Sequence, residues 1–372
     1  MNWTHCILLS ALPVLVLIGC LTTPLRWETA ATAVVYYFLT GLGITAGYHR
    51  LFSHRSFEAS PFFRVLLLLL GSGSVQGSIL WWCRDHRAHH RYVDTEKDPY
   101  SIQNGLFYAH IGWMLVRKER SKVGPADIKD LENDAWIRAQ HKYYPLFAIF
   151  MAFVLPTLVC GLLFGDYWGG YFYAGVARLV FVHHSTFCVN SIAHWLGDAD
   201  YTDGHSARNS FITALITIGE GYHNFHHEDY RNGAEWYHYD PTKWFIAMAE
   251  KLGLAHNLTR FPKNEIVKER LQMKEKRLHE KMSKLNWGPS DDELPRYTLG
   301  QAKKVFQDEL WVIVDGYIVN LSRFAEGHPG GYNIIATLAG RDVTEAFKGG
   351  VYRHSQAAHN LVATYRVAIL QQ

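Results

Sequence analysis

The sequence predicts a mainly α-helical protein, with four transmembrane helices and a cytosolic helical cap that holds a histidine-ligated di-metal site, followed by a small α+β domain. Three observations lead to this prediction. Hydrophobic residues make up 48% of the 372 residues and charged residues only 19%, and the apolar residues gather into long blocks. Histidine-rich motifs lie between and after these blocks. From residue 295 onward the chain changes to short β-rich runs.

The four apolar blocks cover residues 6–21, 29–48, 144–164 and 170–189. Each approaches the roughly 20 residues that a helix needs to cross a bilayer. A cleaved signal peptide is the competing interpretation of the first block. However, no Lys or Arg precedes that block, and the second block follows at once. The short connections 22–28 and 165–169 therefore join the four blocks into two helical hairpins.

A further apolar run, residues 62–82, is expected to be a re-entrant or interfacial helix. It lies between His54 and His86, and a single crossing would place these histidines on opposite faces of the membrane. Metal ligands must converge, so the run is expected to stay on one side, broken at Gly71-Ser72-Gly73-Ser74.

Histidines recur in three boxes, two of which share the pattern His-x-x-His-His. On a helix, residues three and four apart lie on one face. Neutral imidazoles that converge form a transition-metal site. A lone histidine is more often a surface or core residue, but the recurrence favours one metal centre. The boxes are, in chain order, His49 and His54; His86, His89 and His90; and His223, His226 and His227.

The distribution of basic residues predicts the topology. The segment 49–143 holds 14 Lys and Arg residues, whereas the two short connections hold only Arg26. The positive-inside tendency therefore places both termini and every histidine box on the cytoplasmic face. The five cysteines form no Cys-x-x-Cys pair, so neither a disulfide framework nor a thiolate metal site is indicated. No nucleic-acid-binding motif is present.

The last third of the chain predicts a linker and a second domain. Residues 261–294 are expected to form a basic, amphipathic linker helix followed by a boundary rich in turn residues. Two β-rich runs then flank Asp315-Gly316, which indicates a hairpin. His328 opens a His-Pro-Gly-Gly motif and His354 follows 26 residues later. In the absence of Cys-x-x-Cys-His, this pair can ligate one non-covalent haem from both faces.

These motifs resemble two known families. Residues 295–372 resemble cytochrome b5, with His328 and His354 as the axial ligands, although the spacing is slightly longer than in the common form. Residues 1–260 resemble the integral-membrane acyl-CoA desaturases of the stearoyl-CoA type. The whole chain is most similar to a fungal-type Delta-9 desaturase. The matching stretches are Gly43–His54, Arg84–Arg91, Asn190–His194 and Gly219–His227.

The resemblance implies a set of metal ligands and two cofactors, a di-iron pair and haem b. An all-imidazole shell differs from the carboxylate-bridged di-iron sites of soluble bundles. Asn190 is implied to complete the set through a water. His183 and His184 match no box and are expected to be structural. The nine implied histidines are His49, His54, His86, His89, His90, His194, His223, His226 and His227.

The resemblance also implies residues that bind an acyl-CoA substrate. Trp82 and Phe187 match positions that line the acyl-chain tunnel near the metals, and Tyr37 and Gly41 match its far end. Because Gly41 is small, chains of 18 carbons or longer are expected to be accepted, and Gly41→Leu is expected to favour shorter ones. The residues expected at the CoA headgroup are Arg84, Asp85 and Lys142.

The partners implied are O2, an NADH-cytochrome b5 reductase and the lipid bilayer, with the chain placed in the endoplasmic reticulum membrane. The tethered haem domain would deliver electrons at high effective concentration. Three alternative functions remain open at this point, two of them enzymatic and one not. They are a membrane hydroxylase or sterol oxidase with the same boxes, a front-end desaturase, which the His at position 223 disfavours, and a membrane-anchored electron carrier.

Overall fold

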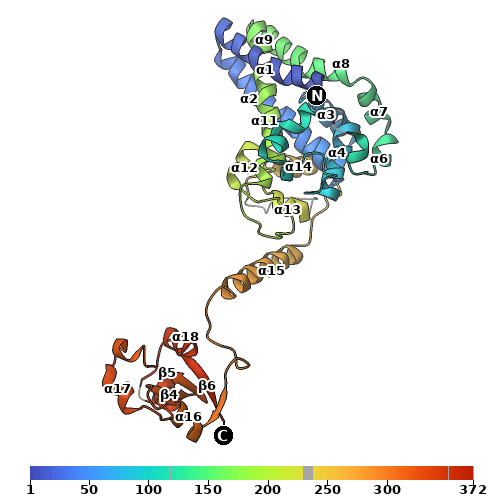
Figure 1. The fold of residues 1–372 in the computed structure, drawn as a ribbon. Helices are drawn as coiled ribbons and strands as arrows, with labels where there is room; N and C mark the ends of the chain where they lie inside the picture. The colour runs from blue at the N-terminus through green and yellow to red at the C-terminus, as the bar shows by residue number, and fades with distance from the viewer. Residues whose placement is uncertain (118, 229–237, 351, 372) are drawn as a thin grey trace. The chain divides into compact units, whose positions relative to one another are not determined.

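The computed structural model describes residues 1–117, 119–228, 238–350 and 352–371. They form two compact units, Met1–Glu275 and Lys276–Gln372 (Figure 1). The division falls inside α15 (Lys263–Met282). The boundaries expected from the sequence, 1–260, 261–294 and 295–372, stay predictions.

Three helical runs of the first unit are long and apolar enough to cross a membrane: Trp3–Thr22, Trp27–Ser53 and Tyr144–Phe164, judged over the described residues. The fourth expected span, 170–189, is also one continuous helical run, but it is less apolar because it carries Arg178, His183 and His184. These runs comprise α1 (Trp3–Thr22), α2 (Trp27–Leu42), η1 (Gly43–Ser53), α8 (Tyr144–Ile149), η5 (Phe150–Val154), α9 (Leu155–Phe164), α10 (Tyr167–Gly169), η6 (Gly170–Ala177) and α11 (Arg178–Asn190).

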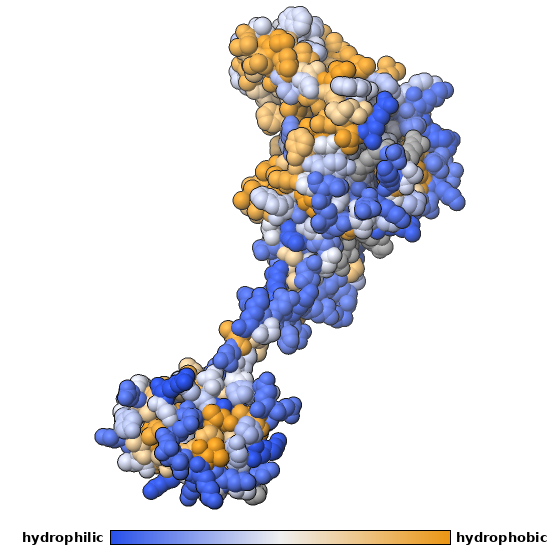
Figure 2. Space-filling model, in the orientation of Figure 1, coloured by the Kyte–Doolittle hydropathy of each residue, from blue (hydrophilic) through white to orange (hydrophobic). Residues whose placement is uncertain are grey.

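The segment η6 packs against α1, α2 and α9, and apolar side chains cover the outer surface of this bundle (Figure 2). Arg178 lies inside the bundle and is 2% exposed. Its guanidinium donates to the carbonyl oxygens of Gly73 at 2.8 Å and Ala152 at 2.9 Å. A buried cation is costly unless its donors are satisfied. Arg178 therefore joins three segments through their backbone carbonyls.

The run expected to be re-entrant contains the short helix α3 (Pro61–Ser72), an irregular stretch, and then α4 (Ile79–Tyr92). Ser60 and Ser78 cap the two helices by accepting from the Phe63 and Trp81 amides. At 1.5 Å per residue α3 extends about 18 Å, well short of the roughly 30 Å hydrocarbon core. It is therefore too short to cross the membrane, and its re-entrant or interfacial placement stays a prediction.

The cap consists of short helices and one two-stranded sheet, in which β1 (Glu58–Ala59) pairs with β2 (Ala255–His256). Its apolar core includes Phe63, Leu67 and Ile79. Its other helices are η2 (Ile102–Asn104), η3 (Tyr108–Gly112), α5 (Trp113–Leu115), η4 (Arg120–Lys122), α6 (Lys129–Glu132), α7 (Ala135–Lys142), η7 (Ile192–His194), α12 (Phe211–Ile216), α13 (His223–Glu228) and α14 (Pro241–Lys251).

The second unit contains a four-stranded sheet in the order β3-β6-β5-β4. The expected hairpin is present, with Asp315 and Gly316 at φ of 54° and 79°, as a type I′ turn requires. The strands are β3 (Arg296–Thr298), β4 (Trp311–Val314), β5 (Tyr317–Asn320) and β6 (Arg366–Gln371), and the helices are α16 (Leu299–Val305), η8 (Ala325–Gly327), α17 (Tyr332–Thr337), η9 (Ala346–Gly350) and α18 (Gln356–Thr364).

Candidate metal centre

The first histidine box lies on η1, a π-helical continuation of α2. In an α-helix, residues five apart point about 140° away from each other. A π-helix closes its hydrogen bonds from i+5 to i, and the amide of His54 donates to the carbonyl of His49 at 3.0 Å. This winding brings His49 and His54 to the same face, with ring centroids 4.7 Å apart. The spacing His-x-x-x-x-His therefore suits a π-helix.

Five histidines from three elements and the residue after η1 converge on one point, and we call them the five-histidine group. Each offers a ring nitrogen within 4.8 Å of the others. The Nε2 atoms of neighbouring rings lie 2.9 to 3.1 Å apart. Such spacings are compatible with metal–nitrogen bonds of about 2.1 Å. The group consists of His49, His54, His86, His90 and His226.

A second group contains His89, His194 and His223, all buried. We call it the three-histidine group. Its closest ring centroids are 4.8 Å apart, between His194 and His223. The second and third boxes each contribute to both groups: on α4, His86 and His90 turn to one group and His89 to the other. The two groups therefore lie next to each other, because α4 and α13 each contribute histidines to both.

Four further residues were singled out in the sequence. His227 belongs to α13, but its side chain lies outside the described residues. Asn190 lines the cavity beside the five-histidine group. His183 bonds to the carbonyl of Ser74 at 2.9 Å and His184 bonds to His110 at 3.0 Å, so neither joins a metal group among the described residues.

Burial sets the protonation of the ligands. Burial, followed by the neighbouring imidazoles, holds the pKa of each of six ligands well below its usual value. These imidazoles are therefore neutral near pH 7, which is the form that binds metal. The six are His54, His86, His90, His194, His223 and His226.

Carboxylates stand behind the three-histidine group. Asp98 Oδ1 lies 2.9 Å from His89 Nδ1. His194 Nδ1 lies 2.7 Å from Ser206 Oγ, which donates to Asp94 at 2.6 Å. A carboxylate on the outer nitrogen of an imidazole fixes its tautomer and raises its strength as a ligand. No sequence pattern predicts these partners, because they follow the boxes at unrelated spacings.

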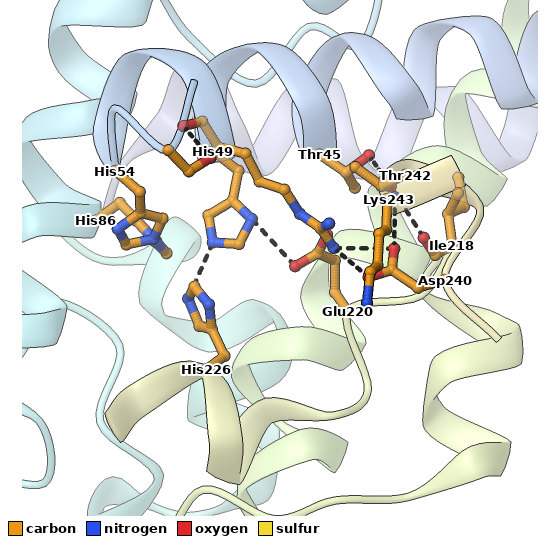
Figure 3. Close-up of polar contacts among 12 residues, drawn as sticks. Thr45, His49, His54, His86, Ile218, Glu220, His226, Asp240, Thr242 and Lys243 are labelled. Carbon is orange, nitrogen blue, oxygen red and sulfur yellow. Dashed lines mark hydrogen bonds and ion pairs between the residues drawn. The ribbon is translucent and has the colours of Figure 1, made fainter. Parts of the chain in front are cut away.

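Behind the five-histidine group, Glu220 Oε2 lies 3.0 Å from His49 Nδ1 (Figure 3). Arg50 donates to Glu220 at 3.0 Å and to Asp240 at 2.9 Å. Burial alone would raise the pKa of Glu220, but the Arg50 guanidinium lowers it. Glu220 is therefore ionised and directs Nε2 of His49 toward the group.

A cavity of about 500 Å³ adjoins the five-histidine group, within the range of ligand pockets. His49 and His86 form part of its wall. Most of its remaining lining is apolar. Of the seven residues expected to bind substrate, four line this cavity: Gly41, Trp82, Asp85 and Phe187.

The other three substrate candidates lie elsewhere. Arg84 and Asp85 line an adjoining hollow of about 530 Å³ together with Arg117. Tyr37 lines a separate apolar groove on α2 and α11. Lys142 packs over the ring of Tyr143 at 5.0 Å and lines none of these three cavities.

A polar bridge crosses the wall of the cavity, and sequence reasoning missed it. Gln76 Nε2 donates to Thr186 Oγ1 at 2.8 Å, and Trp82 Nε1 donates to Gln76 Oε1 at 3.4 Å. The bridge ties the irregular stretch after α3 to α11. Neither Gln76 nor Thr186 belongs to a motif, so only the fold reveals them.

In the second unit, His328 and His354 both adjoin the apolar cluster of β4 and β5. Phe324 and Phe347 belong to this cluster, and they pack on His328 and His354 with centroids 6.0 and 4.5 Å apart. His354 Nδ1 bonds to the carbonyl of Phe347 at 2.9 Å, which leaves Nε2 for a ligand. These residues fit a haem held between two imidazoles.

Comparisons with known proteins follow the same division. Residues 25–259 match the family described as fatty acid desaturase, and residues 298–371 match the cytochrome b5-like heme/steroid binding domain. A probable acyl-CoA desaturase of Schizosaccharomyces pombe is 50% identical over 374 residues, covering 100% of this chain and 78% of that protein. Acyl-CoA desaturase 1 of Saccharomyces cerevisiae is 43% identical over 381 residues, covering 100% and 74%. Stearoyl-CoA desaturase of Homo sapiens is 37% identical over 273 residues, covering 71% and 76%.

Proposed function

The chain belongs to the fatty acid desaturase family and carries a carboxyl-terminal cytochrome b5-like domain, and on this premise we propose that it is a Delta-9 acyl-CoA desaturase. The reaction removes two hydrogens from neighbouring methylenes of a saturated 16- to 18-carbon acyl-CoA. One O2, two electrons and two protons are consumed with them, and two waters are released. The observation that carries this proposal is the apolar cavity whose wall includes two histidines of the metal centre.

The residues present fit a pair of transition metals, and we propose iron at both positions. Eight imidazoles in two groups, most of them buried, supply the donors, and His227 is proposed as a further one, with Asn190 acting through a water. Iron bound here would supply the activation of O2, which amino-acid side chains cannot perform. Glu220 and Asp98 hold His49 and His89 in the tautomer that leaves Nε2 available.

The protein contributes to the choice of the reacting carbons by positioning the acyl chain. Trp82 stacks on His86 with centroids 4.8 Å apart, and the Gln76 bridge fixes Trp82 in place. Phe187 lies on α11 within the same cavity wall. An acyl chain between these rings would meet the five-histidine group with a restricted set of methylenes. Holding reacting atoms in one geometry accounts for a large part of enzymatic rates.

The headgroup is proposed to occupy the hollow lined by Arg84, Asp85 and Arg117. Arg84 is held by Asp85, with 2.7 Å between Nη2 and Oδ1. Guanidinium groups suit phosphates because their donors form a planar fork. Arg117 was not among the sequence candidates, since it lies in a mixed polar segment without a motif.

Haem b, ligated by His328 and His354, is proposed to pass electrons from an NADH-cytochrome b5 reductase. A tether converts this delivery into an intramolecular encounter. The chain is proposed to reside in the endoplasmic reticulum membrane with its boxes and both termini cytoplasmic, in keeping with the Lys and Arg residues concentrated between His49 and Tyr143.

The test is expression in Saccharomyces cerevisiae lacking its own acyl-CoA desaturase. We expect growth without oleate, and 16:1 and 18:1 fatty acids unsaturated at carbon 9, measured by gas chromatography after double-bond derivatisation. A hydroxylated product would instead identify a hydroxylase that uses the same boxes. No product, with the His223→Ala variant and the wild type behaving alike, would leave the electron-carrier interpretation.

A further inference from the structure

Ile218 has a backbone conformation that its side chain disfavours. Its φ is 56°, in the left-handed region, where a β-branched residue is an outlier. Among non-glycine residues with positive φ in the described chain, only Val75 and Ile218 are β-branched. Both line the cavity beside the metal centre. Such strain persists only where the surroundings enforce it, and it concentrates at ligand sites.

Two hydrogen bonds (Figure 3) and a close approach of the backbone at the next residue hold the conformation of Ile218. Thr242 Oγ1 donates to the Ile218 carbonyl at 3.1 Å, and Thr45 and Thr242 join their hydroxyls at 2.6 Å. The next residue, Gly219, has a φ of 96°, and a Cβ there would meet Asp240 Cα at 2.7 Å. The turn at Ile218 is thus fixed from η1 and from the start of α14.

The side chain of Ile218 faces Gly41. Ile218 is 3% exposed, and a Cβ built on Gly41 would clash with its Cδ1 atom. Gly41 and His49 lie eight residues apart on one continuous helical run, a separation on the order of 10 Å. Gly41 and Ile218 therefore face each other deeper in the bundle than the metal ligands do.

We propose that Ile218 is a specificity-determining residue that closes the far end of the acyl-chain cavity together with Gly41. The methyl end of a saturated acyl chain would stop against its Cδ1 atom. This inference rests on the proposed function, and it assigns part of the chain-length selection to the loop before the third histidine box. The strained backbone aims a rigid side chain, so the end of the cavity is a fixed wall.

The Ile218→Val variant tests this directly, because it removes the Cδ1 atom and keeps the β-branch. We expect the ratio of 20-carbon to 18-carbon unsaturated products to rise on the order of tenfold, since one methylene in an apolar pocket changes selectivity by about that factor. The measurement is a competition among saturated acyl-CoAs of 14 to 22 carbons. The matched control is the Ile246→Val variant, because Ile246 is a buried residue of the cap that does not line this cavity. We expect its ratio of 20-carbon to 18-carbon products to equal that of the wild type.

A second pair of variants keeps the test decisive if position 218 affects folding. Gly41→Ala is expected to shift products toward 16 carbons or fewer, because its Cβ pushes the Ile218 side chain into the cavity. Combining it with Ile218→Val is expected to restore the 18-carbon preference. Contacting residues show such non-additivity, whereas distant ones do not.

The outcomes separate this inference from the proposed function. A wild-type chain that yields no unsaturated product would overturn the proposed function. A wild-type chain that desaturates, with Ile218→Val matching Ile246→Val in product ratio or Gly41→Ala adding independently to Ile218→Val, would overturn the role of Ile218.

Discussion

The molecule holds two histidine sites, and they are built in opposite ways. The metal centre takes its ligands from the second span, the second box and the segments after the fourth span, so nearly 180 residues separate its first described ligand from its last. The haem pair lies within one small unit, on loops beside a single sheet. The first site needs the whole membrane fold, whereas the second needs only a local scaffold. Substitutions at the two sites should therefore differ in how much of the protein's activity and metal content they change.

The largest effect is expected from His223→Ala, which removes a ligand that is 1% exposed. Desaturation should fall by more than about 100-fold, because even outer partners of metal ligands are worth 10- to 100-fold. Iron content, measured by mass spectrometry on purified protein, should fall with it. The control is His184→Ala, which changes an exposed histidine outside both groups. Full activity in His223→Ala would show that the three-histidine group is not part of the reaction centre.

His354→Ala is expected to abolish the haem absorption band while leaving the iron of the first unit in place. With purified reductase and NADH, turnover should fall on the order of 100-fold, the scale of gain that tethering gives. Separate soluble cytochrome b5 at high concentration should restore part of it. Loss of iron together with haem would contradict the independence of the two sites.

An intermediate effect is expected from Glu220→Gln. The amide cannot hold His49 as a carboxylate does, so iron affinity and turnover should both fall about 10- to 100-fold. Titration of metal-free protein with Fe(II), followed by dialysis and metal analysis, measures the first quantity. An unchanged affinity would assign Glu220 to the Arg50 ion pair alone, without a part in ligand positioning.

The last expected effect concerns the stability of the protein rather than its activity, and acid causes it. In the folded first unit the pKa of six ligand histidines is lowered, whereas in the unfolded chain the same histidines titrate near pH 6.5. Below that pH the unfolded chain therefore binds more protons than the folded one. Stability is therefore fully present above about pH 6.5 and is lost as the pH falls below it. Thermal unfolding of metal-free protein in detergent should show a melting temperature that decreases over this window. A melting temperature that is flat or rises would contradict the burial of these imidazoles.

Repetition made the larger part of the structure predictable. The apolar blocks, the three boxes and the Asp315-Gly316 turn each repeat or fit a known local rule. The fourth expected span, 170–189, also forms a continuous helix, although Arg178 makes it less apolar than the other three.

What the sequence could not show is the set of single residues that meet only in the fold. Glu220, Gln76 and Ile218 belong to no periodic pattern, and each has one partner that lies at least 110 residues away in the sequence. The division of eight histidines into five and three was equally hidden, because it depends on how α4 and α13 face each other.

The unbroken helical run from Trp27 to Ser53 carries both His49 and Gly41. The distance between the reacting carbons of the substrate and the methyl end of its acyl chain is therefore set by the number of residues between these two positions on one helix. Moving the blocking side chain by one turn of an α-helix displaces it by about 5.4 Å, a step of several methylene groups. The preferred length of the acyl chain can thus change by substitution on this helical run while the metal ligands stay in place.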